Sequence, residues 1–418
     1  MTGTVPSMEL VTGDIAWGGG CVARAEDGRV VFVRHALPGE RVRAEITGET
    51  TSFLRADAIE VVEPSPDRVT PPCPHAGPGR CGGCDWQHIA VPVQRRLKEH
   101  LVAEQLRRVA GIERDVVVEE APGAPGGLGW RTRVRFATGG DGRVGLRRHR
   151  SHELEPLDRC PIATPGVGNS GVFGAEWPAG VEVEAFAEAD DPARRVISVA
   201  TSGRRASPVP EVPSGTVVNG RVVRPPGRLR FEVLGQVFEV SAGSFWQVHT
   251  SAARVLGQAV LELLEPAPGE LAVDLYAGVG LFSVLLGAAV GPDGSVLAVE
   301  HDRGACADAV RNARGMPQVE VRRQGVTPGL VSGWGGPADL VVLDPAREGA
   351  GVAVMRALAS LDPAPRRVAY VSCDPGSFAR DLRVMLEAGW SLPVLRAFDL
   401  FPMTEHVELV GILEPGPG

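Results

Sequence analysis

A cysteine late in the chain stands where an apolar run gives way to a loop. The segment Val371-Ser-Cys-Asp-Pro375 ends one predicted strand, and Leu343-Asp-Pro-Ala-Arg347 ends the strand before it. A thiol at such a strand end is a candidate nucleophile, although an ordinary cysteine with a pKa of about 8.5 is only slightly ionised at neutral pH and needs activation by its site. The alternative interpretation of Cys373 is a small buried hydrophobic residue.

A glycine-rich turn points to a nucleotide-like cofactor. Asp274-Leu-Tyr-Ala-Gly-Val-Gly280 follows an apolar strand and opens a helix, so its glycines let the backbone approach a ligand. Glu300 ends the next strand, where a carboxylate accepts hydrogen bonds from ribose hydroxyls. The third glycine of a dinucleotide fingerprint is replaced by Ser283, which favours S-adenosylmethionine over a nicotinamide cofactor. A purely structural glycine turn remains an alternative.

Two further segments hold groups that could take part in catalysis. Phe401-Pro-Met-Thr-Glu-His-Val-Glu408 offers two carboxylates and His406 beside the last predicted strand. A positioned carboxylate could act as a general base, whereas surface charges are the alternative. Phe245-Trp-Gln-Val-His249 places an aromatic pair and an amide at the start of the second half of the chain. Aromatic pairs usually belong to a core, so this segment alone is a weak signal.

Four cysteines have a spacing that suits metal coordination. Cys73, Cys81 and Cys84 lie within twelve residues, and Cys160 follows much later. Four thiols suffice for tetrahedral zinc or for an iron–sulfur cluster. A zinc ribbon would show a second C-x2-C, and radical enzymes that use S-adenosylmethionine commonly show C-x3-C-x2-C, but neither pattern is present. The residues alone leave the metal open.

Length and composition indicate an ordered protein of two or three domains. The chain has 418 residues, of which 44% are hydrophobic and 22% charged. Its seven cysteines, without a recognisable leader, disfavour a disulfide framework and suggest a cytoplasmic location. The apolar window 271–291 is explained better by a buried strand, a turn and a helix than by a membrane span. The net charge of −8 argues against indiscriminate nucleic-acid binding and leaves room for a local basic track.

Three regions follow from the pattern along the chain. Residues 1–63 contain closely spaced strands broken by glycine turns, which indicates a small barrel. Residues 64–229 contain the cysteines, an amphipathic helix over 91–109 with Lys98 away from its apolar stripe, and a stretch at 131–159 with eight arginines against four acids. That stretch is either a solvated face or a track that contacts phosphates.

Residues 230–418 alternate predicted strands and helices of regular length. This alternation predicts an α/β domain with a parallel, doubly wound sheet, in which a closing hairpin places one strand antiparallel. Parallel strands present their carboxyl ends at one edge, so the loops that carry the glycine turn, Asp344 and Cys373 are expected to meet in one crevice.

Taken together, these motifs resemble the RNA 5-methyluridine (uracil-C5) methyltransferases, in the branch with a TRAM domain and a four-iron cluster. The resemblance covers nearly the whole chain. Its motifs are Gly18-Gly-Gly-Cys-Val-Ala-Arg24, Leu37-Pro-Gly-Glu40, Cys81-Gly-Gly-Cys-Asp-Trp-Gln-His88, Phe245-x-Gln247, the Asp274 turn, Asp344-Pro-x-Arg347, Ser372-Cys373 and His406-Val-Glu408. The chain departs from the usual pattern at His249, Leu281, Ala346 and Asp374.

The resemblance implies a class I Rossmann-like methyltransferase domain, an N-terminal OB-like TRAM barrel and a small central α+β domain. It implies that Cys373 adds to C6 of a uracil in RNA and that Glu408 removes the C5 proton after methyl transfer from S-adenosylmethionine. Cys73, Cys81, Cys84 and Cys160 would hold a 4Fe-4S cluster. Gln247, Tyr276, Glu300, Asp344 and, near the end of the third strand, Gln324 would bind the cofactor.

The same resemblance favours ribosomal RNA as substrate, with transfer RNA as the second choice, and a monomer that does not bind membranes. A non-catalytic RNA-binding protein with a cluster or zinc is the alternative from another functional class. An NAD-dependent oxidoreductase is a third interpretation, which Ser283 disfavours. RNA methylation assays and binding of reduced nicotinamide cofactor would separate the three.

Overall fold

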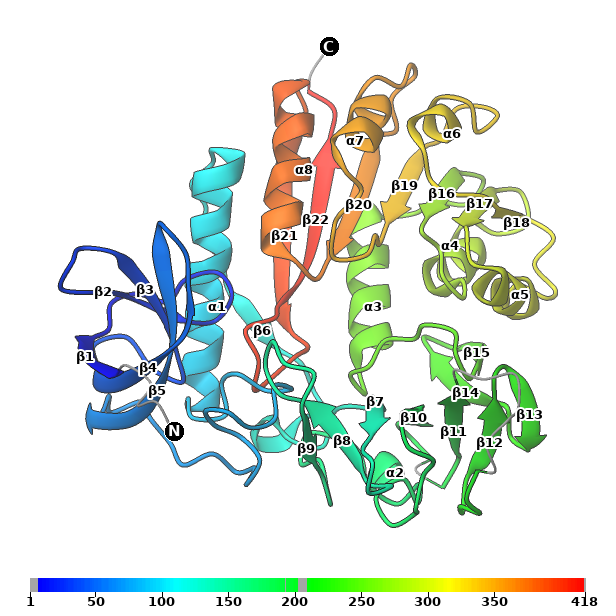
Figure 1. Ribbon diagram of the computed structural model, residues 1–418. Helices are drawn as coiled ribbons and strands as arrows, with labels where there is room; N and C mark the ends of the chain where they lie inside the picture. Colours follow the sequence, from blue (N-terminus) through cyan, green and yellow to red (C-terminus); the bar gives the residue numbers. More distant parts are fainter. Residues whose placement is uncertain (1–6, 192, 202–208, 417–418) are drawn as a thin grey trace.

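The structure is a computed structural model that describes residues 7–191, 193–201 and 209–416. Residues 1–6 of the predicted barrel and residues 417–418 of the predicted last domain lie outside this range. A five-stranded sheet stands at one side of the molecule, and helix α1 (Val91–Gln105) separates it from a large mixed sheet (Figure 1). A seven-stranded sheet lies below the large sheet in this view.

The five-stranded sheet has the order β1-β4-β5-β3-β2, with β3 and β5 parallel and the other pairs antiparallel. Apolar residues alternate along its strands and fill one core together with Cys21. Irregularities in the pairing of β4 with β5 let these long strands curl, as expected of a small barrel. Its strands are β1 (Ser7–Val11), β2 (Cys21–Arg24), β3 (Val30–Arg34), β4 (Arg41–Glu49) and β5 (Phe53–Glu63).

Helix α1 connects two cores. Val93 and Leu101 pack against the barrel, whereas Val102 packs against the large sheet. The helix continues as one wider turn, Leu106–Ala110, and ends at Gly111, whose φ of 74° suits a glycine. The prediction that Lys98 lies on the polar face is wrong, because its ammonium is fully buried in an ion pair from a distant strand.

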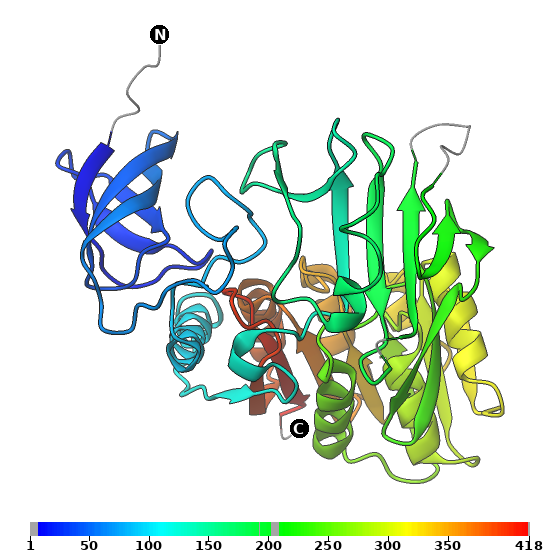
Figure 2. The ribbon, with the colours of Figure 1, turned by 90° about the horizontal axis from the view of Figure 1, so that it is seen from below.

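The seven-stranded sheet has the order β13-β12-β11-β10-β7-β8-β9 and forms the base of the molecule (Figure 2). All neighbours in it are antiparallel except β11 and β12. Its elements are β7 (Arg133–Thr138), β8 (Val144–Arg147), β9 (Leu154–Pro156), α2 (Pro165–Gly168), β10 (Glu182–Ala187), β11 (Arg195–Ala200), β12 (Gly215–Val218) and β13 (Arg221–Arg224).

The large sheet confirms the predicted α/β architecture. Its order is β18-β17-β16-β19-β20-β22-β21-β6, and β18 to β20 run parallel while β22 is antiparallel to β20 and β21. β6, from the segment predicted as the central domain, extends the edge beside β21. The strands are β6 (Val118–Glu120), β16 (Leu271–Leu275), β17 (Ser295–Glu300), β18 (Val319–Arg323), β19 (Leu340–Leu343), β20 (Arg367–Ser372), β21 (Ser391–Asp399) and β22 (Glu408–Glu414).

Helices cover both faces of this sheet. Leu340 and Val342 of β19 point into the core beneath α3 and α4, whereas Val341 and Leu343 point into the core beneath α7 and α8. A hairpin of β14 (Arg228–Val233) and β15 (Gln236–Ser241) precedes these helices. The helices of this region are α3 (Ala252–Leu264), α4 (Leu281–Val290), α5 (Arg303–Asn312), α6 (Pro328–Ser332), α7 (Val352–Ala359) and α8 (Pro375–Glu387). A short 3-10 turn lies earlier in the chain, at Pro125–Gly127.

The strand order locates the crevice. Successive strands add on one side of β16 as far as β18 and on the other side from β19, so the order reverses between β16 and β19. Ligands of open α/β sheets bind at the carboxyl ends of the strands beside such a reversal. The apolar window 271–291 is β16, a glycine turn and α4. Among the described residues, no helix is long and apolar enough to cross a membrane.

Candidate active site

Cys373 lies at the turn between β20 and α8. The strand before it is buried, and the side chain of Asp374 accepts a hydrogen bond from the backbone N–H of Ser377 at 2.7 Å, capping α8 directly behind the thiol. Asp374, one of the positions at which the chain departs from the usual pattern, thus serves as the N-terminal cap of α8. The half-buried thiol is fixed at the carboxyl edge of the sheet.

Glu408 is brought beside Cys373 by the antiparallel strand. Ser372 of β20 pairs with Leu409 of β22, so Cys373 and Glu408 are the next positions along the two neighbouring strands. The Glu408 side chain is buried, with 3% of its surface exposed. Burial, followed by the nearby carboxyl of Asp344, raises its pKa well above the usual value. The predicted nucleophile and the predicted base therefore lie close together at neighbouring strand ends.

Asp344 and Arg347 complete the charged surroundings of the thiol. Asp344 follows β19, the strand between β16 and β20, and burial raises its pKa to about 7. Burial, followed by the nearby carboxyls of Glu408 and Asp344, raises the pKa of Cys373 to about 12, whereas the Arg347 guanidinium acts to lower it. A thiol with so high a pKa is protonated at neutral pH, so nucleophilic attack by Cys373 would require a partner that accepts its proton.

Arg347 contacts a second motif residue. Its Nη2 lies 3.2 Å from Nε2 of His406. Burial and the neighbouring Arg347 lower the pKa of His406 to about 4, so the neutral imidazole accepts the hydrogen bond. Neither residue has a role predicted from its motif alone. Their pairing links the β19 loop to the 400–407 loop, and only the fold reveals it.

The β16 turn forms a cradle suited to a cofactor. Tyr276, Gly278 and Gly280 all have positive φ, and a side chain at Gly280 would approach the backbone of Ala309 in α5. Asp274 is fully buried, and this burial raises its pKa to about 7. One of its oxygens accepts from the Ser283 hydroxyl, while the other is buried with no partner among the described residues.

Glu300 orients the edge of this cradle. Its carboxylate accepts hydrogen bonds from the backbone N–H groups of Gly278 at 3.0 Å and of His301 and Asp302 at 2.7 Å. Gln324 is exposed directly after β18, and its backbone N–H donates to the Glu300 carbonyl at 2.8 Å. The glycine turn and the ends of β17 and β18 are thereby joined, which fits a bound nucleoside with its ribose at Glu300.

Gln247 lies apart from this cradle in the hydrogen-bond network. It precedes α3 and is half-buried, and none of the hydrogen bonds found in the described part of the chain joins its side chain to Asp344 or Cys373. Two residues on, His249 stacks on Trp130 at 5.6 Å, and its Nε2 is buried without a described partner. Leu281 is the buried first residue of α4, and Ala346 is exposed.

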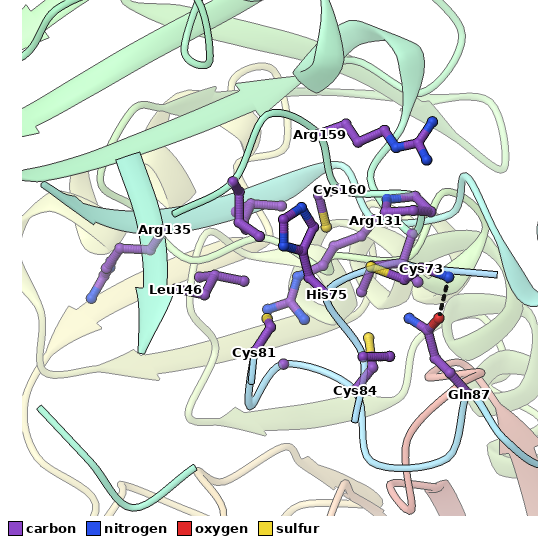
Figure 3. Close-up of a pocket in the computed structure, with 16 residues that line it drawn as sticks. Cys73, His75, Cys81, Cys84, Gln87, Arg131, Arg135, Leu146, Arg159 and Cys160 are labelled. Atoms are coloured by element: carbon purple, nitrogen blue, oxygen red, sulfur yellow. Dashed lines mark hydrogen bonds between the residues drawn. The ribbon is translucent and has the colours of Figure 1, made fainter. Parts of the chain in front are cut away.

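The four predicted metal ligands line one cavity of about 160 Å³, shown in Figure 3. All four are free thiols, and apolar side chains such as Leu146 and Leu157 share the wall with Arg131. Burial raises the pKa of Cys81 to about 11 and raises those of Cys84 and Cys160. No group of three or more His, Cys, Asp or Glu side chains in the described ranges is arranged to hold a metal ion as they stand.

The predicted basic track divides into structural and exposed arginines. Arg133 is buried against Glu184, and Arg148 pairs with Glu153 and lies 3.6 Å from Glu155. Arg147 is exposed at the end of β8, and the described residues offer it no ion-pair partner. Part of this stretch therefore stabilises the central sheet, and only its exposed members are available to phosphates.

Comparison with known proteins identifies the family. The TRAM domain model matches residues 10–59. The chain is 46% identical to RNA methyltransferase SCO5901 of Streptomyces coelicolor over 97% of this chain and 92% of that protein. It is 32% identical to the 23S rRNA (uracil(1939)-C(5))-methyltransferase RlmD of Alkalilimnicola ehrlichii over 93% of this chain and 92% of that protein.

A solved structure has the same fold over the full length. The tRNA (uracil-54, C5)-methyltransferase of Pyrococcus abyssi, in complex with S-adenosyl-L-homocysteine, matches 97% of this chain and 100% of its own with a TM-score of 0.73 and 22% identity. The barrel, central sheet and Rossmann-like sheet are thus shared. With the identity to the RlmD enzyme, the chain belongs to the uracil-C5 family of S-adenosylmethionine-dependent RNA methyltransferases.

Proposed function

We propose that this protein methylates C5 of a specific uridine in ribosomal RNA through a covalent adduct between Cys373 and C6 of the uracil. The observation that carries the proposal is the position of Cys373 and Glu408 at adjacent strand ends, where the thiol and the buried carboxyl lie close to each other. A nucleophile and a base on neighbouring strands are what attack at C6 and proton removal at C5 require, since C5 and C6 are bonded to each other.

The cofactor lies at the β16 cradle in this proposal, with Tyr276, Glu300 and Gln324 around its nucleoside and Asp344 and Gln247 toward the uracil. The unpartnered oxygen of Asp274 and the positive φ angles of the turn support this location. S-adenosylmethionine supplies a methyl group on a positively charged sulfur. A nearby cation stabilises the charged form of a buried carboxyl whose pKa is raised, as at Asp274 and Asp344. The positively charged sulfur of the cofactor would therefore be bound favourably near these two carboxyls.

The reaction begins at Cys373. Its thiol loses a proton to one of the neighbouring carboxylates, Asp344 or Glu408, and the sulfur then bonds to C6 while the C5–C6 double-bond electrons make C5 nucleophilic. C5 takes the methyl group, and the electrons of the broken S–CH3 bond stay with the sulfur of the departing S-adenosyl-L-homocysteine. Glu408 then removes the C5 proton, the double bond forms again, and the C6–S bond breaks with its electrons returning to sulfur. The raised pKa of Glu408 gives its carboxylate a high affinity for the C5 proton, provided that Glu408 is ionised when this step begins.

The target base must leave its stack, because C6 is shielded in a duplex. The TRAM barrel and the exposed arginines near Arg147 would hold the RNA while the uracil enters the pocket. Ribosomal RNA is favoured over transfer RNA because the RlmD enzyme is 32% identical, whereas the Pyrococcus enzyme is 22% identical.

Cys73, Cys81, Cys84 and Cys160 would hold a 4Fe-4S cluster in their cavity. The donor set fits, since four thiols from two distant segments surround one space and each can bind a separate iron. Their raised pKa values express the cost of buried thiolate charge, which bound iron offsets. The cluster is structural in this proposal, because methyl transfer by this route moves no net electrons.

The test is methylation of defined RNA. The anaerobically purified protein is incubated with S-adenosylmethionine and transcripts of 23S rRNA or transfer RNA, and 5-methyluridine is mapped. A single modified uridine in 23S rRNA, absent from RNA of a deletion strain, is expected. RNA binding without methylation of any transcript, and unchanged RNA in the deletion strain, would favour the non-catalytic alternative.

A further inference from the structure

Of the 43 lysine and arginine residues of the chain, only Lys98 is a lysine. Its side chain is fully buried. Lys98 Nζ donates to Asp399 Oδ1 at 2.6 Å and to the carbonyl of Phe401 at 3.0 Å. It also lies 6.0 Å from the ring centre of Trp86. An ammonium is a compact charge on a flexible stem, whereas a planar guanidinium needs room for five donors. A closed site with two acceptors side by side therefore suits lysine.

Gln94, one helical turn earlier on α1, holds the same loop at a second point. Its side chain is fully buried. Oε1 accepts from the backbone N–H of Met403 at 2.7 Å, while Nε2 donates to the carbonyls of Trp86 and Ile89 at 3.1 and 2.8 Å. The side-chain amide therefore uses both ends to tie α1 and the cysteine loop to Met403.

Met403 is the strained point of this loop. Its φ of 69° is disfavoured for a residue with a side chain. Both its backbone groups are nevertheless satisfied, because the N–H donates to Gln94 and the carbonyl accepts from the N–H of Trp86 at 3.0 Å. Such a conformation persists only where the surroundings impose it. The contacts from α1 and Trp86 are the surroundings that impose it here.

The loop 400–407 joins β21 to β22 and leads directly into Glu408, with His406 on the way. We propose that Lys98 and Gln94 are positioning residues that clamp loop 400–407 and thereby fix Glu408 against the C5 proton. The inference rests on the proposed function above, in which Glu408 is the general base. A proton transfer depends on distance and angle, so a base on a loosened loop loses rate even when its chemistry is unchanged.

The clamp also gives the N-terminal part of the chain a role in catalysis. Trp86 follows Cys84 by two residues, contacts Lys98, and donates through Nε1 to the Gly19 carbonyl of the barrel at 3.0 Å. Cys84 and Cys160 pack in the same apolar group as Trp130, Met403 and Phe401. The barrel, the cysteine loop and α1 therefore converge on one loop, although none of them contributes a reacting group in the proposed mechanism.

Two variants of the full-length protein test the clamp. Lys98→Met combined with Asp399→Asn removes both members of the ion pair, so neither is left behind as an unpaired buried charge. Gln94→Met leaves the ion pair intact and releases Met403. The measurement is a single turnover with excess enzyme and 23S rRNA, in which methyl transfer and the methylated covalent adduct are followed separately. A slowed base prolongs the adduct, whereas partial unfolding only lowers the amplitude of all species.

We expect each variant to lengthen the lifetime of the methylated adduct at least tenfold, with less than a threefold change in the rate constant of methyl transfer. The matched control is Arg366→Met with Glu270→Gln, which removes an ion pair of 2.6 Å at the far end of the large sheet. It should leave the adduct lifetime unchanged.

Glu408→Gln in the same assay separates the two proposals. If Glu408→Gln prolongs the adduct and neither clamp variant does, the clamp inference is wrong and the proposed function stands. If Glu408→Gln leaves it unchanged, the base assignment itself fails.

Discussion

Five cysteines of this chain have candidate chemical roles, and they occupy two different environments. Cys373 lies among charged groups, near the carboxyls of Glu408 and Asp344 and the guanidinium of Arg347. Cys73, Cys81, Cys84 and Cys160 lie around a cavity whose other walls are largely apolar. Burial raises the pKa of Cys373 as it raises those of Cys81, Cys84 and Cys160. A raised thiol pKa therefore does not by itself distinguish a nucleophile from a ligand.

The two environments differ in the groups that surround the thiols. A nucleophile must lose its proton before it attacks, and its bond to the substrate must break again afterwards. It therefore needs a base nearby and space for the substrate to enter. A ligand set needs other thiols and protection from water. Cys373 has one carboxyl neighbour on the adjacent strand, whereas the four cavity cysteines have one another. The following predictions test this division.

The largest effect is expected for Cys373→Ala. Removal of the proposed nucleophilic sulfur should lower methylation by at least about a thousandfold and abolish adduct formation. S-adenosylmethionine binding, measured by calorimetry, should stay within about threefold. Appreciable turnover by this variant would place the nucleophile elsewhere, and an equal loss for Cys306→Ser would show that the effect is not specific.

Glu408→Gln should lower turnover by about 10² to 10⁴, the usual contribution of a general base. Glutamine keeps the shape of the side chain but cannot take the C5 proton, so the steps before proton removal remain possible. A methylated RNA–protein adduct should accumulate and survive denaturing electrophoresis. Formation of this adduct must require both Cys373 and S-adenosylmethionine. If the double variant Glu408→Gln with Cys373→Ala formed the adduct equally well, the proposed attack by Cys373 would be contradicted.

That Asp344 and Cys373 lie at the same edge of the sheet could be predicted from sequence, because each follows the end of a parallel strand. Asp344 and Cys373 follow β19 and β20, whose apolar runs are unbroken, and parallel strands bring such ends together. The proximity of Glu408 is less direct. It depends on β22 running antiparallel beside β20, which a closing hairpin allows but does not require.

The interior positions of charged residues could not be predicted. Lys98 belongs to the polar side of its helix by periodicity, yet it is buried because Asp399, 301 residues later, supplies a charge at 2.6 Å. Arg133 is likewise buried by Glu184. A period of 3.6 residues describes a helix with one buried face, and α1 has two, since it packs against the barrel and the large sheet.

The central sheet was the least predictable part of the fold. Strands β10 to β13 are four to six residues long, and β12 pairs in parallel with β11 across a connection that includes residues outside the described range. Short strands carry too few residues for alternation to be distinctive. The convergence of Cys160 with the cysteines at 73–84 depends on this sheet, so spacing alone could suggest ligands but not their common cavity.

A moderate effect is expected for Cys160→Ser, which tests the other side of the comparison. Iron in anaerobically purified protein should fall from about four atoms per chain to below one, and the midpoint of thermal unfolding should fall by roughly 5 °C because a bound group that stabilises the fold is lost. The matched control is Cys21→Ser, a cysteine buried in the barrel whose hydrogen bond to the Ala36 carbonyl a serine can keep. Stoichiometric zinc, with iron absent in the wild type, would overturn the cluster.

The smallest effect concerns the pH dependence of Cys373 in the free enzyme. A raised pKa means that more hydroxide is needed to form thiolate, so alkylation of Cys373 by iodoacetamide should rise about tenfold for each pH unit between 8 and 10. An ordinary thiol with a pKa of about 8.5 levels off within that range. Arg347→Met removes a cation that lowers this pKa and should slow alkylation further. The Cys373 peptide is quantified by mass spectrometry. A plateau above pH 9 would mean that Cys373 has a lower pKa than expected and is already activated before RNA binds. Cys373 would then not be a protonated thiol in the free enzyme.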